Sequence, residues 1–311
     1  FQSVSCDGGN DLARDNQKLI VGPWAHIRPF TQPTTKGAGD IDFGVDSPIE
    51  LHQHLLDWFD YWMKHKDTGI KDKPPVLLFV MGKNEWRYEN EWPLKRTQYT
   101  KFHFHSNGKA NSRHGDGSLS IIPSQDEPLD SYIYDPKNPV PTRGGNTLII
   151  PHGVFDQRPI EDRNDMLIYT SDPLDRDLEI TGPISVKLFA STTADDTDFT
   201  AKLVDVHPNE YAQNIQDGII RARFRTSRKY PARIYPNEIY EYSIDLWSTS
   251  HVFLKGHSLR VEISSSNFPR FDRNPNTLSP LGEDTQMLSA KQDIYHSYQY
   301  PSHILLPVIS S

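Results

Sequence analysis

Cysteine is nearly absent from this sequence: Cys6 is the single one among 311 residues. A lone thiol cannot form a disulfide within the chain, so packing and hydrogen bonds must hold the fold together. The scarcity fits a reducing compartment such as the cytoplasm and is also compatible with the periplasm or secretion, so the sequence assigns no location. Cys6 lies in a stretch rich in Gly, Asp and Asn, and we interpret it as an ordinary half-exposed residue rather than a nucleophile.

Long apolar runs and a surplus of positive charge are missing too. No apolar run approaches the roughly 20 residues needed to cross a bilayer. Lys and Arg number 33 against 41 Asp and Glu, a net charge of −8, which favours solubility and argues against nucleic acid or an anionic membrane as a partner. The chain starts at Phe1 without an initiator Met, a basic segment or an apolar leader, and we expect an internal cut in a longer protein.

The most informative absence is that of Gly-x-Ser-x-Gly, the motif that presents the nucleophile of many serine hydrolases. It matters because residues 19–26, Leu-Ile-Val-Gly-Pro-Trp-Ala-His, read as a short buried strand that turns at Gly-Pro and presents a histidine at the rim of a sheet. His26 suits a general base, which takes a proton from a hydroxyl and returns it to the leaving group. A base without a nucleophile predicts that the chain is the C-terminal part of a serine hydrolase.

The first seventy residues read as α/β. The composition, 36% hydrophobic and 11% aromatic, is sufficient for real cores, and the length makes two domains the expectation. Strand 18–22 is followed by a loop and a predicted helix over 47–66, with Ser47 as N-cap, Pro48 in the first turn and Glu50 completing a capping box. Gly69 can terminate it. Its apolar side chains share one broad face: Leu51, Leu55, Trp58, Phe59, Trp62 and Met63.

From Pro74 onward the pattern changes to short β-rich runs separated by turn residues. Many strands with little helix indicate a mainly β fold, a β-sandwich or jelly roll. Pro74-Pro75 is the expected seam, dividing the chain into residues 1–73 and 74–311. Residues 106–165, rich in Pro and Gly, are predicted to form long ordered loops. The predicted strands are Val76–Met81, Tyr99–His105, Met166–Thr170, Ile184–Ala190, Phe199–Val206, Gly218–Arg225, Ile239–Leu246, Ser258–Ser264 and His303–Ile309.

A series of motifs in a shared order resembles the cocaine esterase-like hydrolases, a family that includes X-Pro dipeptidyl-peptidases, α-amino acid ester hydrolases and glutaryl-cephalosporin acylases. The motifs are Gly22-Pro23-Trp24-Ala25-His26, Phe79-Val80-Met81-Gly82 with Glu85-Trp86-Arg87, Phe155-Asp156-Gln157-Arg158-Pro159, Tyr169-Thr170-Ser171, Thr181-Gly182-Pro183, Asp196–Val206, Asp217-Gly218-Ile219, Gly256–Arg260 and Ser264–Thr277. The resemblance implies an α/β-hydrolase domain with an inserted helical cap and a C-terminal jelly roll. This chain would hold the last strand and helix of the first, and all of the jelly roll.

The resemblance also implies a Ser-His-Asp triad in which His26 is catalytic, while the Ser and Asp lie upstream. The implied substrate is a small ester or amide, or a short peptide, and the implied partners are the upstream hydrolase and cap portions of the same protein. A homo-oligomer is left open, and no cofactor is implied. Jelly-roll loops can border the acyl pocket in this family, so we expect substrate contacts from Ile150, Val154 and Phe155. Trp24 could also wall the substrate site or could pack beneath the loop, and packing is favoured.

Four polar groups are candidates for metal or substrate sites, and none is predicted to bind a metal. His103 and His105 share a strand face, whereas His52 and His54 do not share a helix face, and neither pair has further ligands beside it. Asp195, Asp196 and Asp198 could hold calcium, but are expected to cap the following strand, with Asp198 bonded to backbone. The loop from Arg270 to Asn276 could touch substrate, and a structural role is favoured.

Two non-enzymatic functions compete with the hydrolase. A jelly roll resembles lectin-like binding modules, and the aromatic side chains of Trp86, Tyr88 and Trp92 could stack on sugars, although packing is their commoner use. A purely structural domain is the third option. The strand that leads to His26 favours the hydrolase, because a lectin has no reason to begin with it.

Overall fold

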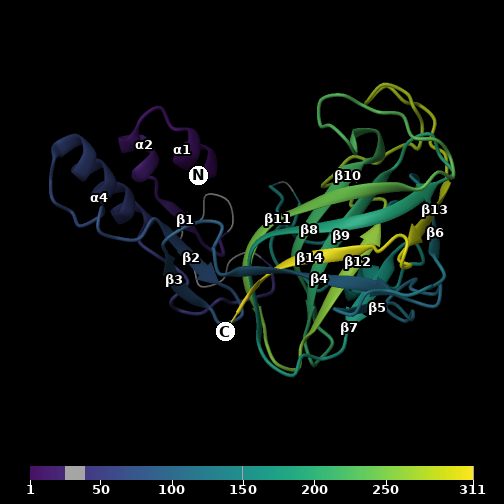
Figure 1. Ribbon diagram of the computed structural model, residues 1–311, viewed down its shortest axis with the longest axis horizontal. Coiled ribbons are helices and arrows are strands. Elements are labelled where there is room, and N and C mark those ends of the chain that lie inside the picture. The colour runs from purple at the N-terminus through teal and green to yellow at the C-terminus, as the bar shows by residue number, and fades with distance from the viewer. Residues whose placement is uncertain (25–38, 149, 311) are drawn as a thin grey trace.

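The computed structural model describes residues 1–24, 39–148 and 150–310. They form a small three-stranded sheet with helices beside it and a larger β-sandwich (Figure 1). The predicted mainly β fold with a sandwich at its centre is confirmed. Within these ranges, no helix has the length and apolar character to span a membrane.

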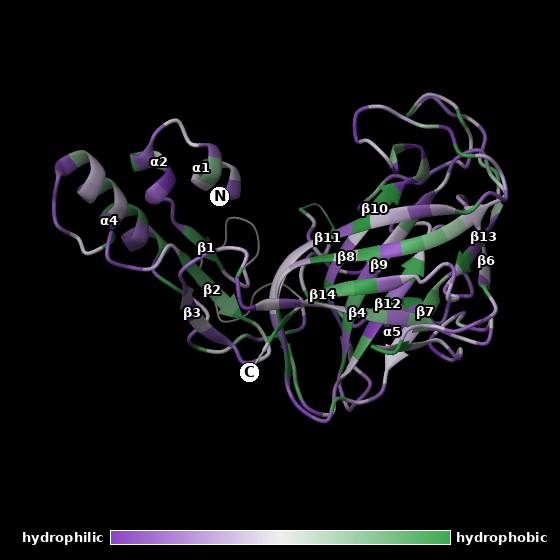
Figure 2. Cartoon of the chain, viewed as in Figure 1, coloured by the Kyte–Doolittle hydropathy of each residue, from purple (hydrophilic) through white to green (hydrophobic). Residues whose placement is uncertain are grey.

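The small sheet has the α/β character expected of the first part of the chain. Strand β1 (Leu19–Val21) pairs in parallel with β2 (Val76–Val80), and β2 pairs antiparallel with β3 (Glu85–Glu89). A parallel pair needs a long crossover, and here it contains a helix. All five residues of β2 are buried, and Figure 2 shows its apolar character. The expected domain division at residue 74 lies between these two paired strands, and it stays a prediction.

The predicted helix is present but shorter than expected at both ends. Helix α4 spans Leu51–Lys64, its N-cap is Glu50 without a side-chain cap bond, and His65 ends it in the left-handed conformation at φ 56°. The predicted capping box at Ser47 is therefore wrong: Ser47 lies in a turn, where its N–H donates to the carbonyl of Gly44, and the helix begins four residues later. None of the helix residues is buried.

Two short helices, α1 (Gln2–Asp7) and α2 (Asp11–Asp15), precede β1 and were not predicted. Cys6 lies on α1 and is exposed rather than half-exposed. In Figure 1, both helices lie with α4 beside the small sheet, away from the sandwich.

Each of the nine predicted strands overlaps an observed one, and four further strands were missed. The stretch 106–165 is not only loop, since it holds two strands and a helical turn. In one of these strands, β6 (Asp130–Tyr134), the alternating side chains of Tyr132 and Tyr134 are buried. The prolines and glycines around this strand hide its alternating pattern in the sequence. The predicted run to Arg225 ends early because a 3₁₀ turn, η1 (Ala222–Phe224), follows β10. The remaining elements are β4 (Thr97–His105), β5 (Ser118–Ser120), β6 (Asp130–Tyr134), α5 (Arg158–Glu161), β7 (Leu167–Ser171), β8 (Leu178–Thr192), β9 (Asp198–Val206), β10 (Ala212–Arg221), β11 (Tyr240–Phe253), β12 (Ser258–Ser264), β13 (Ala290–Tyr295) and β14 (His303–Ile309).

The sandwich encloses one large apolar core. Its strands follow the order β10-β9-β12-β7-β5-β4-β14-β8-β13-β6, and β11 pairs with β8. Side chains from β8, β9, β12 and β14 meet in a single buried cluster, and the rings of Phe104 and Tyr169 stack within it, 4.5 Å between centroids. Burial of this kind, at about 25 cal/mol per Å² of apolar surface, is the main stabilising contribution.

Candidate functional site

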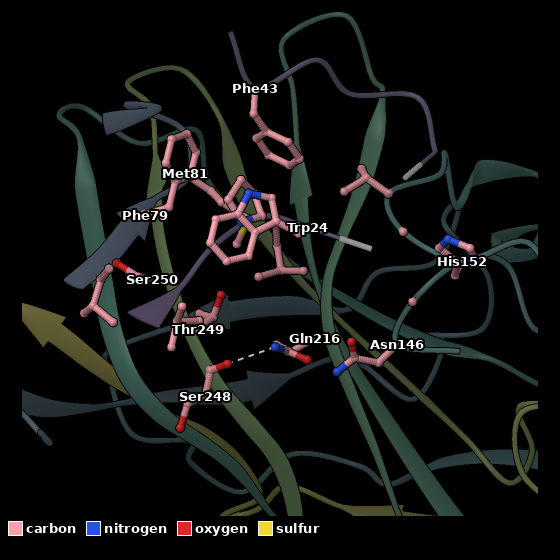
Figure 3. A pocket seen from close by; sticks show the side chains of 18 of the residues that line it. Trp24, Phe43, Phe79, Met81, Asn146, His152, Gln216, Ser248, Thr249 and Ser250 are labelled. Atoms are coloured by element: carbon pink, nitrogen blue, oxygen red, sulfur yellow. Dashed lines mark hydrogen bonds between the residues drawn. The ribbon is translucent and has the colours of Figure 1, made fainter. Parts of the chain in front are cut away.

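A cavity of about 620 Å³ lies between the small sheet and the sandwich. Figure 3 shows it from close by, with Trp24, Phe43, Phe79 and Met81 on one wall and Gln216 with Ser248 on the other. It is the size of a small-molecule site. The lining residues are Leu19, Val21, Gly22, Pro23, Trp24, Phe43, Leu78, Phe79, Met81, Trp92, Gly145, Asn146, Thr147, Leu148, His152, Gly153, Val154, Ile215, Gln216, Ser248, Thr249 and Ser250.

Main-chain bonds join the two walls directly. The N–H of Met81 donates to the carbonyl of Ser250 at 3.1 Å, and the N–H of Val252 donates to the carbonyl of Met81 at 2.8 Å. Gly82 follows with φ +87°, and a Cβ there would lie 2.2 Å from the carbonyl oxygen of Val252. Only glycine fits this close approach, so the small sheet is held against β11 at a fixed distance.

Aromatic rings form the apolar wall. The Trp24 ring lies 5.4 Å from that of Trp86, and the Phe79 ring contacts both Trp86, at 5.3 Å, and Phe43, at 6.0 Å, between centroids. The indole N–H of Trp24 donates to the carbonyl of Ser47 at 3.4 Å. Trp24 therefore both lines the cavity and packs against Trp86.

Two β-bulges shape the polar wall. The register of β10 shifts between Asn214 and Gln216, and that of β11 shifts between Asp245 and Ser248. In a regular strand, neighbours face opposite sides of the sheet, but a bulge re-aims one of them. Ile215 and Gln216 both line the cavity for this reason. The Gln216 amide donates to the carbonyl of Ser248 at 2.9 Å, the dashed line in Figure 3.

A closed loop forms the rim on the sandwich side. Gly145 and Gly153 exchange main-chain bonds of 2.7 and 3.0 Å, and the Asn214 side chain accepts from the N–H of Phe155 at 2.7 Å. These bonds anchor both ends of the loop, and Leu148 and His152 within it line the cavity.

The predicted substrate residues fall into three groups. Trp24 and Val154 line the cavity, whereas Ile150 and Phe155 are not among its lining residues. His26 lies outside the described residues. Their roles in binding and catalysis stay predictions. Further residues line the cavity for which the sequence indicates no site role: Phe79 and Met81, which belong to one of the motifs above, and Phe43, Gln216 and Ser248–Ser250.

The cavity carries no charge on its described walls. No Asp, Glu, Lys or Arg occurs among the described lining residues, and His152 is the one titratable side chain there. In a chain with 74 charged residues, 33 basic plus 41 acidic, this is a selective depletion. Such a surface can take a neutral apolar group out of water without leaving a charge unpaired.

The acidic cluster considered for calcium is instead paired with arginines. Asp196 accepts from Arg223 at 2.7 Å, and Asp198 accepts from Arg221 at 2.8 Å. The Asn274 side chain donates to both carboxylates, at 3.0 and 2.8 Å. The prediction that Asp198 bonds to backbone is therefore wrong, because side chains of β10 and of the loop after β12 satisfy it. The favoured structural role of that loop is also seen at Arg270, which pairs with Asp217.

The histidine pairs considered for metal do not converge on a common point. The His103 ring lies 5.4 Å from that of His303, while His105 contacts Glu127 at 2.7 Å. In the described part of the chain, neither these residues nor His52 and His54 belong to a three-ligand cluster.

An ion-pair network fastens the small sheet to the sandwich near the cavity. Arg87 on β3 donates two bonds to Glu179 on β8, one of them 2.9 Å long, and a third to Glu89 at 2.7 Å. Arg96 also binds Glu89, at 2.7 Å. The side chains of Arg87 and Glu179 are only 25% and 12% exposed, so this clamp is shielded from solvent.

We expect Arg87→Met to destabilise the fold by about 1–3 kcal/mol. This is less than the roughly 3–5 kcal/mol for a fully buried pair, because Arg87 keeps some exposure. Lys95→Met is the matched control: its pair with Glu91 is exposed, and its loss should cost under about 1 kcal/mol. Urea unfolding of both variants measures the difference, and equal losses would contradict a special role for the clamp.

The same clamp predicts a pH dependence. Burial opposes ionisation of Glu179, but the bonds from Arg87 and Thr181, together with the positive charge of Arg87, outweigh it and hold the pKa of Glu179 below its ordinary value of 4.5. A carboxyl with a depressed pKa stabilises the fold above its unfolded-state pKa, and this contribution is lost as pH falls through the folded-state pKa. The stability gap between parent and Arg87→Met should therefore narrow below about pH 4.5.

Comparisons with known proteins agree with this architecture. Residues 68–305 match the X-Pro dipeptidyl-peptidase C-terminal non-catalytic domain. The cocaine esterase of Rhodococcus sp. (strain MB1 Bresler) is 42% identical over 299 residues, which cover 94% of this chain and 51% of that protein. An aminopeptidase from a marine sediment archaeon, Thaumarchaeota archaeon, superposes with a TM-score of 0.82 at 27% identity over 94% of this chain and 49% of its own. An α-amino acid ester hydrolase superposes with a TM-score of 0.78 at 27% identity over 94% and 50%. The chain thus spans about half the length of the relatives it matches.

Proposed function

Because the chain belongs to the family of X-Pro dipeptidyl-peptidase C-terminal non-catalytic domains, we propose that it is the C-terminal part of a serine hydrolase. The enzyme would cleave ester or amide bonds through a Ser-His-Asp triad, with the Ser and Asp upstream of these residues. The names of the relatives support this, since they are an esterase, an ester hydrolase and an aminopeptidase.

In this proposal, His26 is the general base and later the general acid. It would take the proton of the serine hydroxyl and return it to the leaving group. His26 follows Trp24 by two residues, and two residues of chain reach at most about 7 Å. Trp24, which belongs to the same motif, lines the cavity, and this supports a role for the motif at this site.

The sandwich supplies a wall of the substrate pocket rather than reactive groups. The observation that carries this part is the lack of Asp, Glu, Lys and Arg on the described walls of the cavity, which are lined by aromatic rings on one side and by amide and hydroxyl groups on the other. Such a surface suits a neutral apolar acyl or alkoxy group. An X-Pro peptide carries an ammonium group that needs a carboxylate partner, and the described walls offer none. The proposed substrate is therefore a neutral ester.

We expect the intact protein to hydrolyse p-nitrophenyl butyrate far better than glycyl-prolyl p-nitroanilide. Val154→Asp should lower kcat/KM for the ester by about 10- to 100-fold, because it places a charge in the apolar cavity. Ile133→Asp is the matched control, since Ile133 is 57% exposed on β6, and it should leave kcat/KM within about twofold. Peptidase preference in the parent, or equal effects of the two variants, would contradict the proposal.

The runner-up is a non-catalytic binding or structural module. The family description itself calls the domain non-catalytic, which agrees with a wall that holds substrate while the triad acts from elsewhere. A sugar-stacking platform has less support. Trp86 packs against Trp24 and Phe79, and Trp92 lines the cavity, so these rings do not form an open surface.

A further inference from the structure

A second site is built at the end of the sandwich where β9, β10 and β12 meet. Asp205 is on β9, and His207 follows the last residue of that strand. His257 directly precedes β12, whose first residue pairs with Val206. The register therefore places the two histidines side by side, although fifty residues separate them in the sequence. Their rings lie 4.4 Å apart, centroid to centroid.

Asp205 contacts two histidines of this region at once. Its side chain is 2% exposed, and its two oxygens accept from His257 Nδ1 at 2.8 Å and from His251 Nε2 at 2.9 Å. The cluster therefore holds a buried carboxyl group in contact with two imidazoles.

The hydrogen bonds also set the tautomers of the imidazoles. A carboxylate only accepts, so Nδ1 of His257 carries its proton in the metal-free cluster, and an ion bound by both Asp205 and His257 would replace this proton, which is released to solvent. His207 Nε2 contacts the side-chain oxygen of Gln213 at 3.0 Å. An amide oxygen also only accepts, so the lone pair of His207 lies on Nδ1. Bonds of this kind orient and polarise histidines that bind metals.

We propose that Asp205, His207 and His257 form a binding site for a divalent transition-metal ion. Each offers a ligand atom, and these atoms lie within 4.8 Å of one another, which no other three-ligand group does in the part of the chain that the structure describes. Ligands around a tetrahedral zinc ion are about 3.4 Å apart, so a modest side-chain rotation closes the site. Two imidazoles with one carboxylate suit Zn²⁺, Co²⁺ or Ni²⁺.

The site is open on one side and closed on the other. Asp205 and His257 are buried, whereas His207 is half-buried, which leaves the fourth position to water. The bound ion would tie the turn after β9 to the turn before β12. This role is independent of ester hydrolysis and of the cavity, so it goes beyond the proposed function.

Zinc titration of the intact, metal-stripped protein tests the proposal. His207→Ala carries the test because it removes no bond to Asp205. We expect it to lose one equivalent of bound Zn²⁺, or to weaken that equivalent at least about 10-fold, since even loss of a partner behind the ligands costs about 10- to 100-fold. His114→Ala is the matched control: His114 is 70% exposed, beside Asp162, and zinc binding should match the parent.

Two further readouts separate a lost ligand from a damaged fold. Zn²⁺ should raise the melting temperature of the parent and of His114→Ala, but not that of His207→Ala, whose metal-free melting temperature should stay near that of the parent. Co²⁺ should give visible absorption bands in the parent that His207→Ala loses or alters. Absence of a bound equivalent in the parent, or equal binding by parent and His207→Ala, would overturn the proposal.

Discussion

In the intact protein, His26→Ala is expected to lower kcat for p-nitrophenyl butyrate by about 10⁴- to 10⁶-fold. The chemical step loses its proton shuttle, while binding groups in the cavity remain. The free energy of unfolding should change by less than about 1 kcal/mol, as for a substitution that leaves no core void. Parallel measurements of kcat and melting temperature decide between a catalytic and a structural histidine.

His152→Ala is the matched control for this experiment. His152 lines the cavity, on the loop between Gly145 and Gly153, so it tests whether loss of an imidazole from the cavity wall has the same effect. We expect kcat within about 10-fold of the parent. Near-parental kcat in His26→Ala would remove His26 from the mechanism, and a collapse of its melting temperature would assign it to structure.

Expressed alone, the 311-residue chain is expected to show no specific ester turnover, a loss on the order of 10⁶-fold relative to the intact enzyme. The chain contains no Gly-x-Ser-x-Gly motif, and it spans about half of the relatives it matches. Any remaining turnover should be insensitive to His26→Ala. Saturable turnover that His26→Ala abolishes would contradict the assignment of the nucleophile to upstream residues.

The isolated chain should also expose apolar surface that the intact protein covers. Along α4, four large apolar side chains are 41–73% exposed, and a helix face of this kind is normally covered: Leu55, Leu56, Phe59 and Met63. We expect the isolated chain to bind an apolar dye and to self-associate. The double variant Phe59→Lys, Met63→Lys should reduce dye binding in isolation, yet destabilise the intact protein. A monodisperse, dye-negative parent chain would contradict this.

Much of the fold could be predicted because strands and helices leave local periodic signals. The nine predicted strands each overlap an observed one, since runs such as 199–206 and 258–264 are β-rich over their whole length. Boundaries were harder. Helix α4 starts after Glu50 rather than at Ser47, which lies in a turn closed by its main-chain bond to Gly44. The strand at 130–134 was not predicted because it lies among prolines, which indicate turns and loops.

The sequence by itself determined the class of fold, the one strong helix and the motif around His26, because each depends on residues that are neighbours in the chain. Only the tertiary structure decided which distant segments meet. Trp24, Val154 and Gln216 line one cavity, and Asp205, His207 and His257 form one cluster, although no local pattern links them. Strand order and register bring these residues together, and bulges at Gln216 and Ser248 turn neighbouring side chains toward the same space. Pairing of this kind depends on the packing of the whole core, so it cannot be read from periodicity along the chain.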